Sequence, residues 1–381
     1  MGTDAIGGNI RRIRRSKGMS QKELAQVAEI SLAGLQNIER RRSVPRVDTL
    51  TALAKMLEVG IQDLVTPLPE LQAVRFRSFK SLKTREQILA DVSRWLQDFN
   101  ELEGMVKDNR EFSVRVPTDA DGVLDPVEAA SEVRTQCGLD QGEPVRDISG
   151  LLESNGVKLF SVDVASDAFF GLSVGGNGGG PAIVVNTWDR ISVERQIFTA
   201  AHELGHLVLH LSDYGVDEKE ETKDQESHAN LFASHFLMPE ETFRKEWGET
   251  YGSSMVDRVL KVKRMFRVSY RTVLFRLSQD VEDKAAFWKS FQVQYKQRFG
   301  KTLLKRDEPE ALVADAFRAS APEASRAGEP ERLSKIDFVQ DRLFLLVRKA
   351  VEGNIITLSR GAEILGLTVN EMRELSRSWV G

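Results

Sequence analysis

The sequence has 381 residues, of which 41% are hydrophobic and 29% charged, a composition typical of soluble globular proteins with two or three domains. No apolar run approaches the roughly 18 residues of a membrane span, and the basic N-terminus is not followed by the apolar segment of a secretory signal. The lone Cys137 excludes an internal disulfide framework and fits a reducing compartment, so we expect a cytoplasmic protein without a membrane partner.

Residues 1–66 carry a local excess of positive charge inside an acidic chain. They contain eleven Lys and Arg against seven Asp and Glu, whereas the whole sequence has a formal net charge of -4. This asymmetry favours an anionic partner. Ile6, Ile10 and Ile13 recur at helical spacing and predict a first helix with a basic outer face that ends at Gly18.

Cap residues predict the helices that follow. Ser20 and Glu23 have the capping-box spacing of a second helix, and Ser31 is suited to cap a third helix over 32–40. A proline then separates this helix from a fourth one, predicted over 50–57. Residues 1–66 are therefore predicted to form an all-α domain.

This run of helices resembles the helix-turn-helix domain of the phage-repressor (XRE) family. The matching residues are Ser20 to Ala25, Ile38, Glu39, Arg40, Pro45, Leu53, Ala54, Leu57, Val59 and Leu64. The resemblance implies that the helix after Ser31 enters the major groove of a double-stranded DNA operator. It implies base-facing positions at Ala33, Gln36 and Asn37, and phosphate contacts at Gln21, Arg40, Arg41 and Arg42. A solvated charge run or a helical dimerisation module is the alternative interpretation.

The segments 67–117 and 118–304 are predicted as a connector and an α+β domain. The connector should hold a strand at 74–78 and a helix over 84–99. In the second segment the pattern predicts helices over 126–137 and 148–153, then strands at 156–162, 169–174 and 181–186. The glycine run 175–180 lacks a phosphate-cradling spacing and predicts a hairpin. We expect the strand that ends near Asn186 to offer an edge for an extended peptide substrate.

The pattern His-Glu-x-x-His occurs at His202, Glu203 and His206. On a helix, residues four apart lie one turn above each other, so the two imidazoles can bind one cation with the glutamate beside them. All five histidines of the chain fall between positions 202 and 235. This arrangement is typical of zinc metallopeptidases; the alternative is a buried helix whose histidines only form hydrogen bonds.

A zinc site needs at least one more protein ligand, and Glu226 is the best candidate. Asn230 lies one turn further along the same predicted helix and could hydrogen-bond a ligand histidine. His228 and His235 are rival ligands, although neither shares the helix face of Glu226.

Two histidines, one carboxylate and an open fourth position are typical of a catalytic zinc ion. In such a site Glu203 is the general base and later the proton donor to the leaving amine. A group that stabilises the oxyanion is also required, and His210, Tyr214 and His235 are the nearby candidates.

Residues 193–206, Glu226 with Asn230, and Phe236 to Pro239 resemble the ImmA/IrrE family of zinc metallopeptidases. The resemblance implies a thermolysin-like core with zinc held by His202, His206 and Glu226 and with Glu203 as the base. It also implies cleavage or inactivation of a partner repressor during stress or in mobile elements.

Helices are predicted to continue over 255–266 and 269–277, and the second of these could close over the cleft. Residues 305–331 are predicted as a linker, and 332–381 as a C-terminal helical module. In that module, residues 357–368 resemble a small helix-turn-helix, although an interaction or dimerisation module fits equally well.

Two functions follow from these patterns. The first is a DNA-binding regulator with a zinc-dependent endopeptidase domain that cleaves a protein partner, in particular a repressor. The second is a transcription factor whose metal domain senses a metal or a ligand and cleaves nothing. In either case the symmetry of operators favours a homodimer.

Overall fold

The structure, a computed structural model, describes residues 3–66, 74–76, 85–112, 114, 125–140, 142–176, 179–210, 222–312 and 329–379. The chain divides into two compact units, which are described separately below. The first unit comprises Met1–Leu71 and Phe79–Glu101, and the second comprises Gln72–Ser78 and Leu102–Gly381. The fold is α+β, mostly helical with one small sheet. Among the helices of the described residues, none is both long and apolar enough to cross a membrane.

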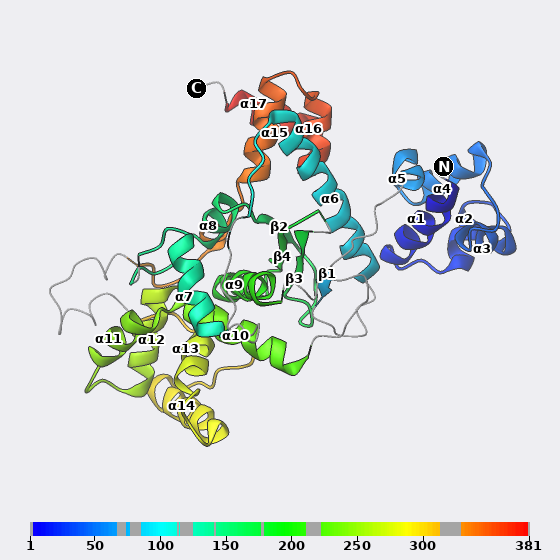
Figure 1. The fold of residues 1–381 in the computed structure, drawn as a ribbon. Helices are drawn as coiled ribbons and strands as arrows, with labels where there is room; N and C mark the ends of the chain where they lie inside the picture. Colours follow the sequence, from blue (N-terminus) through cyan, green and yellow to red (C-terminus); the bar gives the residue numbers. More distant parts are fainter. Residues whose placement is uncertain are drawn as a thin grey trace. The chain divides into compact units, whose positions relative to one another are not determined.

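Short helices around one apolar core form the first unit (Figure 1). They are α1 (Thr3–Ser16), α2 (Gln21–Val27), α3 (Leu32–Glu39), α4 (Val47–Met56) and α5 (Ile61–Val65). The longer helix α6 (Arg85–Val106) belongs to this unit as far as Glu101 but contributes no residue to that core. The predicted caps are present, because the Ser20 and Ser31 hydroxyls accept hydrogen bonds from the backbone amides of Glu23 and Gly34. Helix α4 begins at Val47, three residues earlier than predicted, with Arg46 as its N-cap residue.

Gly7 allows α1 to pack closely against the end of α3. A Cβ atom at position 7 would lie only 2.0 Å from the carbonyl oxygen of Ile38. Ile10, Leu24 and Leu35 are fully buried in the core that this contact closes. The apolar spacing in the sequence therefore predicted the core of the first unit.

A four-stranded sheet with the order β1-β3-β4-β2 lies in the second unit. The strands are β1 (Val74–Phe76), β2 (Lys158–Val162), β3 (Gly171–Val174) and β4 (Ala182–Asn186). Strand β4 pairs in parallel with β2 and antiparallel with β3, and β1 pairs antiparallel with the other side of β3. The expectation that the strand ending at Asn186 offers a free edge was wrong, because β4 lies inside the sheet and all five of its residues are buried.

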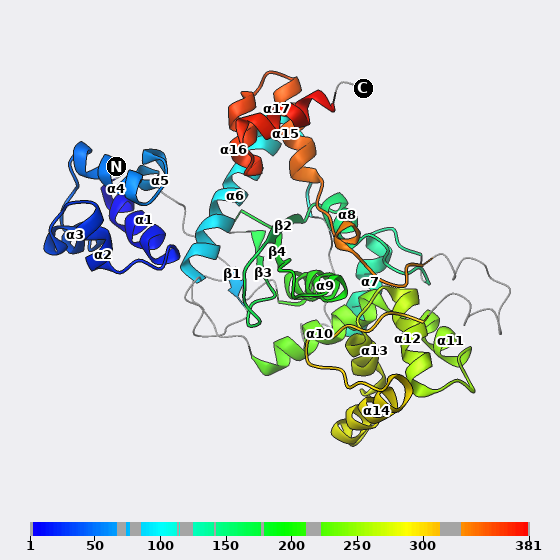
Figure 2. The same cartoon turned by 180° about the vertical axis from the view of Figure 1, so that it is seen from behind.

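Helices pack with the sheet and with one another to build the large core of the second unit (Figures 1 and 2). They are α7 (Pro126–Gln136), α8 (Ile148–Ser154), α9 (Val193–Leu209), α10 (Lys223–Leu237), α11 (Glu240–Gly248), α12 (Met255–Phe266), α13 (Tyr270–Leu277) and α14 (Lys284–Phe299). Helix α9 contacts both β3 and β4, and α10 packs along α9. This packing brings two consecutive helices together next to the sheet.

The chain ends in a short 3-10 helix, η5 (Lys335–Asp337), and three helices: α15 (Arg342–Glu352), α16 (Leu358–Leu365) and α17 (Val369–Arg377). Arg342 is buried at the start of α15, where it forms an ion pair with Glu103 of α6. The backbone amide of Arg342 also donates a hydrogen bond to Glu153 of α8, at 3.1 Å. These contacts attach the C-terminal helices to the second unit.

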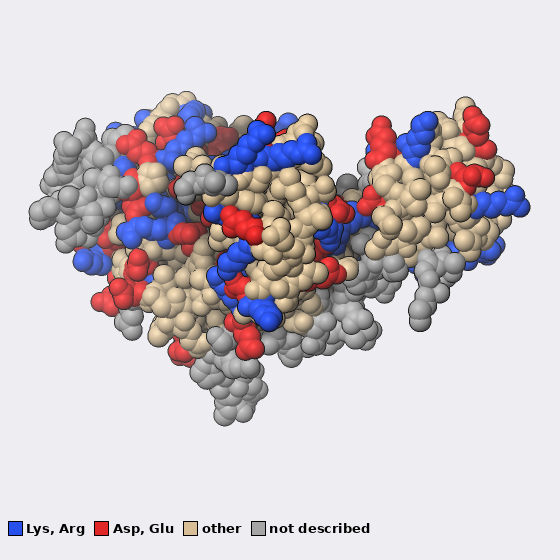
Figure 3. All heavy atoms as spheres, turned by 90° about the horizontal axis from the view of Figure 1, so that it is seen from above, with Lys and Arg blue, Asp and Glu red and all other residues tan. Residues whose placement is uncertain are grey.

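Most of the predicted linker, residues 313–328, lies outside the described residues. Glu329, near the C-terminal end of the predicted linker, is buried and accepts hydrogen bonds from Arg146 and Arg267 at 2.7 and 2.8 Å. Charged side chains of both signs are interspersed on the face of the second unit that Figure 3 shows.

Candidate metal centre and helix-turn-helix

Helix α9 places the two histidines of the His-Glu-x-x-His pattern in the core of the second unit. Ser192 caps the helix, and nearly every residue from Val193 to Leu207 is buried. His202 and His206 are 3% and 1% exposed, and their Nε2 atoms lie 3.1 Å apart. The one-turn spacing in the sequence therefore predicted their convergence.

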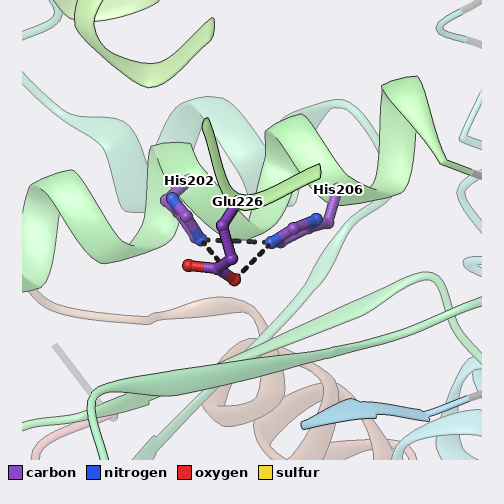
Figure 4. Close-up of side chains that lie close together, drawn as sticks. All are labelled: His202, His206 and Glu226. Carbon is purple, nitrogen blue, oxygen red and sulfur yellow. Dashed lines mark hydrogen bonds and ion pairs between the residues drawn. The ribbon is translucent and has the colours of Figure 1, made fainter. Parts of the chain in front are cut away.

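Helix α10 contributes the third group, Glu226, from its first turn. Its Oε1 atom lies 3.4 Å from Nε2 of His206 and 3.7 Å from Nε2 of His202 (Figure 4). In a tetrahedral zinc site with bonds of about 2.0–2.2 Å, neighbouring ligand atoms lie about 3.3–3.6 Å apart. Two imidazoles and a carboxylate that converge at these distances form a donor set that fits a zinc ion.

The far side of His206 contacts another histidine. Nδ1 of His206 lies 3.2 Å from Nδ1 of His210, and the His210 ring stacks on that of His228 with 6.2 Å between centroids. His228 therefore supports His210 and does not join the ligand cluster. Among the described residues, no hydrogen bond links Asn230 to either ligand histidine, and Asn230 lines the adjacent cleft.

Glu203 is only 3% exposed and is held by the neighbouring strand. The Ser173 hydroxyl of β3 donates a hydrogen bond to Oε2 of Glu203 at 2.7 Å. The strand can approach α9 this closely because residue 171 is a glycine: a Cβ atom there would lie 2.5 Å from Cγ2 of Thr199 and 3.4 Å from Oε1 of Glu203. Glu203 is therefore fixed beside the two histidines.

A cleft opens beside Glu203 and His202. It is lined by four aromatic rings and two arginines, with polar groups between them: Phe170, Phe198, Phe275 and Trp288, then Arg195 and Arg271, and Thr199, Asn230, Ser269 and Thr272. The guanidinium of Arg195 lies over the Phe170 ring, 3.9 Å from its centroid. Helix α13 supplies part of the wall, consistent with the predicted helix that closes over the cleft.

The sequence analysis did not place Arg195 or Arg271 at this cleft. Arg195 lies seven residues before His202, which is close to two helical turns, so the same face of α9 carries both. This spacing could have predicted that Arg195 lies near the candidate site. Arg271 gave no such signal, because its place at the cleft depends on how α13 packs.

His235, one of the candidates for the oxyanion-stabilising group and a rival to Glu226 as ligand, does not lie at the candidate metal centre. It lines another pocket, with Arg134 of α7 and Glu240 of α11. Nine residues separate it from Glu226, which is two and a half helical turns, so it lies on the opposite side of α10. Burial and the nearby charge of Arg276 lower the pKa of His235 to about 3. Tyr214, another oxyanion candidate, lies outside the described residues.

In the first unit, α3 presents the predicted base-facing side chains. Ala33 and Asn37 are exposed and Gln36 is half-buried, and Arg40, Arg41 and Arg42 are exposed at the end of the helix. Arg41 adopts a left-handed backbone conformation with a φ of 60°, at the turn where the XRE family often has glycine.

A buried ion pair joins α3 to α1. Nε of Arg14 lies 2.6 Å from Oε1 of Glu39, and both side chains are buried. The Gln21 amide donates a hydrogen bond to Oε2 of Glu39 at 2.6 Å. Gln21, predicted to contact phosphate, thus has its amide nitrogen directed at this pair.

Comparison with known proteins agrees with both parts of the chain. The sequence model of the IrrE N-terminal-like domain, of the M78 peptidases, matches residues 152–278, and a helix-turn-helix model matches residues 10–64. The uncharacterized HTH-type transcriptional regulator y4dJ of Sinorhizobium fredii is 42% identical over 65 residues, which are 17% of this chain and 84% of that protein. The HTH-type transcriptional regulator DdrOP3 of Deinococcus deserti is 31% identical over 83 residues, 22% of this chain and 60% of that protein.

A solved structure, Bacillus thuringiensis PlcR in complex with the peptide PapR7 and DNA, aligns over 99% of both chains with 13% identity. Its TM-score of 0.17 is too low to support an argument. The chain belongs to the XRE-type helix-turn-helix transcriptional regulators and carries an M78 peptidase domain of the IrrE type.

Proposed function

We propose that this protein is a cytoplasmic DNA-binding regulator with an active zinc endopeptidase domain, which cleaves a partner repressor or regulator in response to stress. The convergence of His202, His206 and Glu226 within 4.8 Å of one another, with Glu203 beside them, is the observation that carries the peptidase proposal. A site of this composition, next to a cleft, is typical of catalytic zinc rather than structural zinc.

His202, His206 and Glu226 would hold the zinc ion. When bound, zinc supplies Lewis-acid chemistry that polarises a scissile carbonyl and makes water more acidic. Glu203 accepts a proton from the attacking water and returns it to the leaving amine. The hydrogen bond from Ser173 fixes the carboxylate for this role.

The cleft favours an extended segment with an apolar side chain. Its aromatic rings can bury that side chain, and Arg195 and Arg271 provide positive charge near His202 and Glu203. In this proposal one of these arginines takes the oxyanion-stabilising role for which the sequence offered His210, Tyr214 and His235 as candidates.

The first unit would bind DNA and so bring the peptidase domain to an operator. Inserted into the major groove, α3 would place the amides of Gln36 and Asn37 at base edges, where they can pair with adenine. Arg40, Arg41 and Arg42 would neutralise phosphates. A symmetric operator would then be bound by a homodimer.

The isosteric substitution Glu203→Gln tests the enzyme proposal. It removes the base and leaves the ligands in place, so we expect cleavage of the substrate to fall by about a hundredfold or more. Zinc content and DNA affinity should remain at the level of the unmodified protein. The measurements are mass spectrometry of purified helix-turn-helix repressors incubated with the protein, metal analysis, and DNA-binding titration.

Glu241→Gln is the matched control, because Glu241 is exposed on α11 and does not line the cleft. Equal cleavage by the protein and its Glu203→Gln variant would refute the proposed base. If the zinc-loaded protein cleaves none of the repressors, the result would instead favour the alternative function, a transcription factor whose metal domain senses a metal or a ligand.

A further inference from the structure

The three C-terminal helices repeat the local geometry of the helix-turn-helix in the first unit. Helix α2 follows the N-cap residue Ser20, and α16 follows the N-cap residue Thr357, 337 residues later. Helix α3 follows Ser31, and α17 follows Thr368, again 337 residues later. The two helix pairs therefore begin in the same register.

The turns between the paired helices also match. Glu29 and Gly366, which are equivalent at this offset, both have left-handed backbones, with φ angles of 56° and 67°. The backbone amide after each of them reaches back to the first helix: Ile30 to the Ala25 carbonyl at 3.0 Å, and Leu367 to the Ala362 carbonyl at 2.8 Å. Both turns thus have the same hydrogen bond at the same position.

The packing positions correspond as well. Leu35 and Met372, both fully buried, occupy the same place in α3 and α17. Ala25 and Ala362 are the equivalent small buried residues of the first helices. A third helix completes each core. In the first unit α1 contributes Ile10 and Ile13. In the C-terminal helices α15 contributes Val347 and Ala350, again 337 residues later.

The outer face of α17 carries side chains suited to reading DNA. Asn370, Arg373, Glu374 and Arg377 are exposed, at the positions equivalent to Ala33, Gln36, Asn37 and Arg40. An asparagine can pair bidentately with adenine and an arginine with guanine. An arginine at the end of such a helix can contact phosphate.

The same face argues against a protein partner. Helices that dock on proteins present large apolar or aromatic anchors. The only exposed large hydrophobic residue of α17 is Val369, and Met372 points into the core. Among residues 342–379 six Lys and Arg stand against four Asp and Glu, so the segment is mildly basic within an acidic chain.

From these observations we infer that α15, α16 and α17 form a second duplex-DNA-binding module, with α17 as its recognition helix. It lies outside residues 10–64 and 152–278, to which the helix-turn-helix and peptidase models correspond. The ion pair of Arg342 with Glu103 attaches this module to the second unit. The N-terminal helix-turn-helix domain, α1 to α5, which we call the reader, belongs to the first unit. One chain thus has a DNA-binding surface on each unit, and the second surface does not depend on proteolysis.

The test uses the full chain, because the module is anchored by residues outside it. Arg40, Arg41 and Arg42 are first changed to Ala, which weakens the reader and leaves its core intact. Binding is then measured by fluorescence anisotropy with a labelled random-sequence duplex of about 30 base pairs, roughly three helical turns, over a series of salt concentrations.

In this background, Arg373→Ala combined with Arg377→Ala should weaken binding about tenfold or more. It should also reduce the slope of log affinity against log salt by about two, since each lost phosphate or base contact removes one charge. Arg373→Lys should retain most of the affinity for random duplex, but should lose base preference in a selection from that pool, because lysine cannot form the arginine fork.

Arg244→Ala is the control for the loss of an exposed positive charge elsewhere on the same unit, because its side chain is 79% exposed on α11; it removes one charge, as each of the single variants Arg373→Ala and Arg377→Ala does. Circular dichroism and the thermal midpoint establish that each variant is folded. Unchanged affinity and salt slope in the doubly substituted chain would overturn the inference. A change in oligomeric state with unchanged DNA binding would also overturn it, and would identify an interaction module. The loss of DNA affinity caused by the Arg40, Arg41 and Arg42 substitutions alone tests the N-terminal helix-turn-helix, so failure of that part is distinguished from failure of the present inference.

Discussion

His235 is a half-buried base that the folded chain keeps neutral. It lies close to Arg134, Glu240 and Arg276, and burial together with the Arg276 charge lowers its pKa to about 3. In the unfolded chain the pKa of a histidine is about 6.5. As the pH falls below 6.5, the unfolded state therefore binds a proton that the folded state does not, and the free energy of unfolding decreases until the pH reaches about 3.

We predict that His235→Gln makes the stability of the protein less sensitive to acid. Glutamine keeps a polar group in the pocket but cannot be protonated, so the loss of stability between pH 7.5 and pH 5 should be smaller than in the unmodified protein. Urea unfolding at both pH values measures it. An equal loss in both proteins would show that His235 does not titrate with a lowered pKa.

At the same scale, the residues of the candidate site differ in how far the sequence could predict them. His202 and His206 lie one turn apart on one helix, so local spacing was sufficient. Glu226 was predicted from its position on the next helix, and the same helical phase separated it from His235, which nevertheless remained one of the oxyanion candidates. Arg271 could not be predicted, because no local pattern specifies which side of α13 faces the cleft.

Helices α9 and α10 hold the ligands and pack closely through one glycine. A Cβ atom at Gly205 would lie 2.9 Å from Cδ1 of Phe232, which is buried in α10. Since this contact joins the helix of His202 and His206 to the helix of Glu226, the geometry of the metal centre depends on it.

We predict that Gly205→Ala lowers the free energy of unfolding by about 1–3 kcal/mol, because the added methyl group overpacks this interface. It should also weaken zinc binding by displacing Glu226. Gly104→Ala is the control: no atom lies within 4 Å of its added Cβ in α6, so alanine should stabilise the helix by about 0.5–1 kcal/mol. Chemical denaturation and zinc titration measure both effects, and a Gly205→Ala variant with unchanged zinc affinity would contradict the proposed coupling.

The sequence predicted most elements but not the order of the strands. Ser20 and Ser31 begin their helices as predicted, because a cap is a local interaction. The place of β4 inside the sheet depends on its pairing with β2 on one side and β3 on the other, and β3 in turn pairs with β1, which comes from a distant part of the chain. Alternating or continuous hydrophobicity indicates that a strand is buried, but does not say which strands flank it.

At the scale of the whole molecule, the two units have separate hydrophobic cores. Leu35 is fully buried in the first core, whereas the helices that carry the candidate metal ligands belong to the second. A cavity made in the first core should therefore affect DNA binding without altering the metal centre.

We predict that Leu35→Ala destabilises the first unit by about 2–5 kcal/mol, the usual cost of removing a buried leucine side chain. Differential scanning calorimetry of the full chain should show an earlier transition for this unit and an unchanged transition for the second. Affinity for duplex DNA should fall, and zinc content should remain constant. A parallel loss of zinc would show that the two cores unfold as one.

Strand β1 pairs with the strand that holds Glu203. Arg75 of β1 lies opposite Ser173 of β3 in the strand register, and Ser173 holds Glu203. The short strand that comes after the DNA reader in the chain is therefore the neighbour of the strand that orients the proposed base. A substitution that alters the pairing of β1 with β3 would therefore act one backbone ladder away from the carboxylate on which the proposed hydrolysis depends.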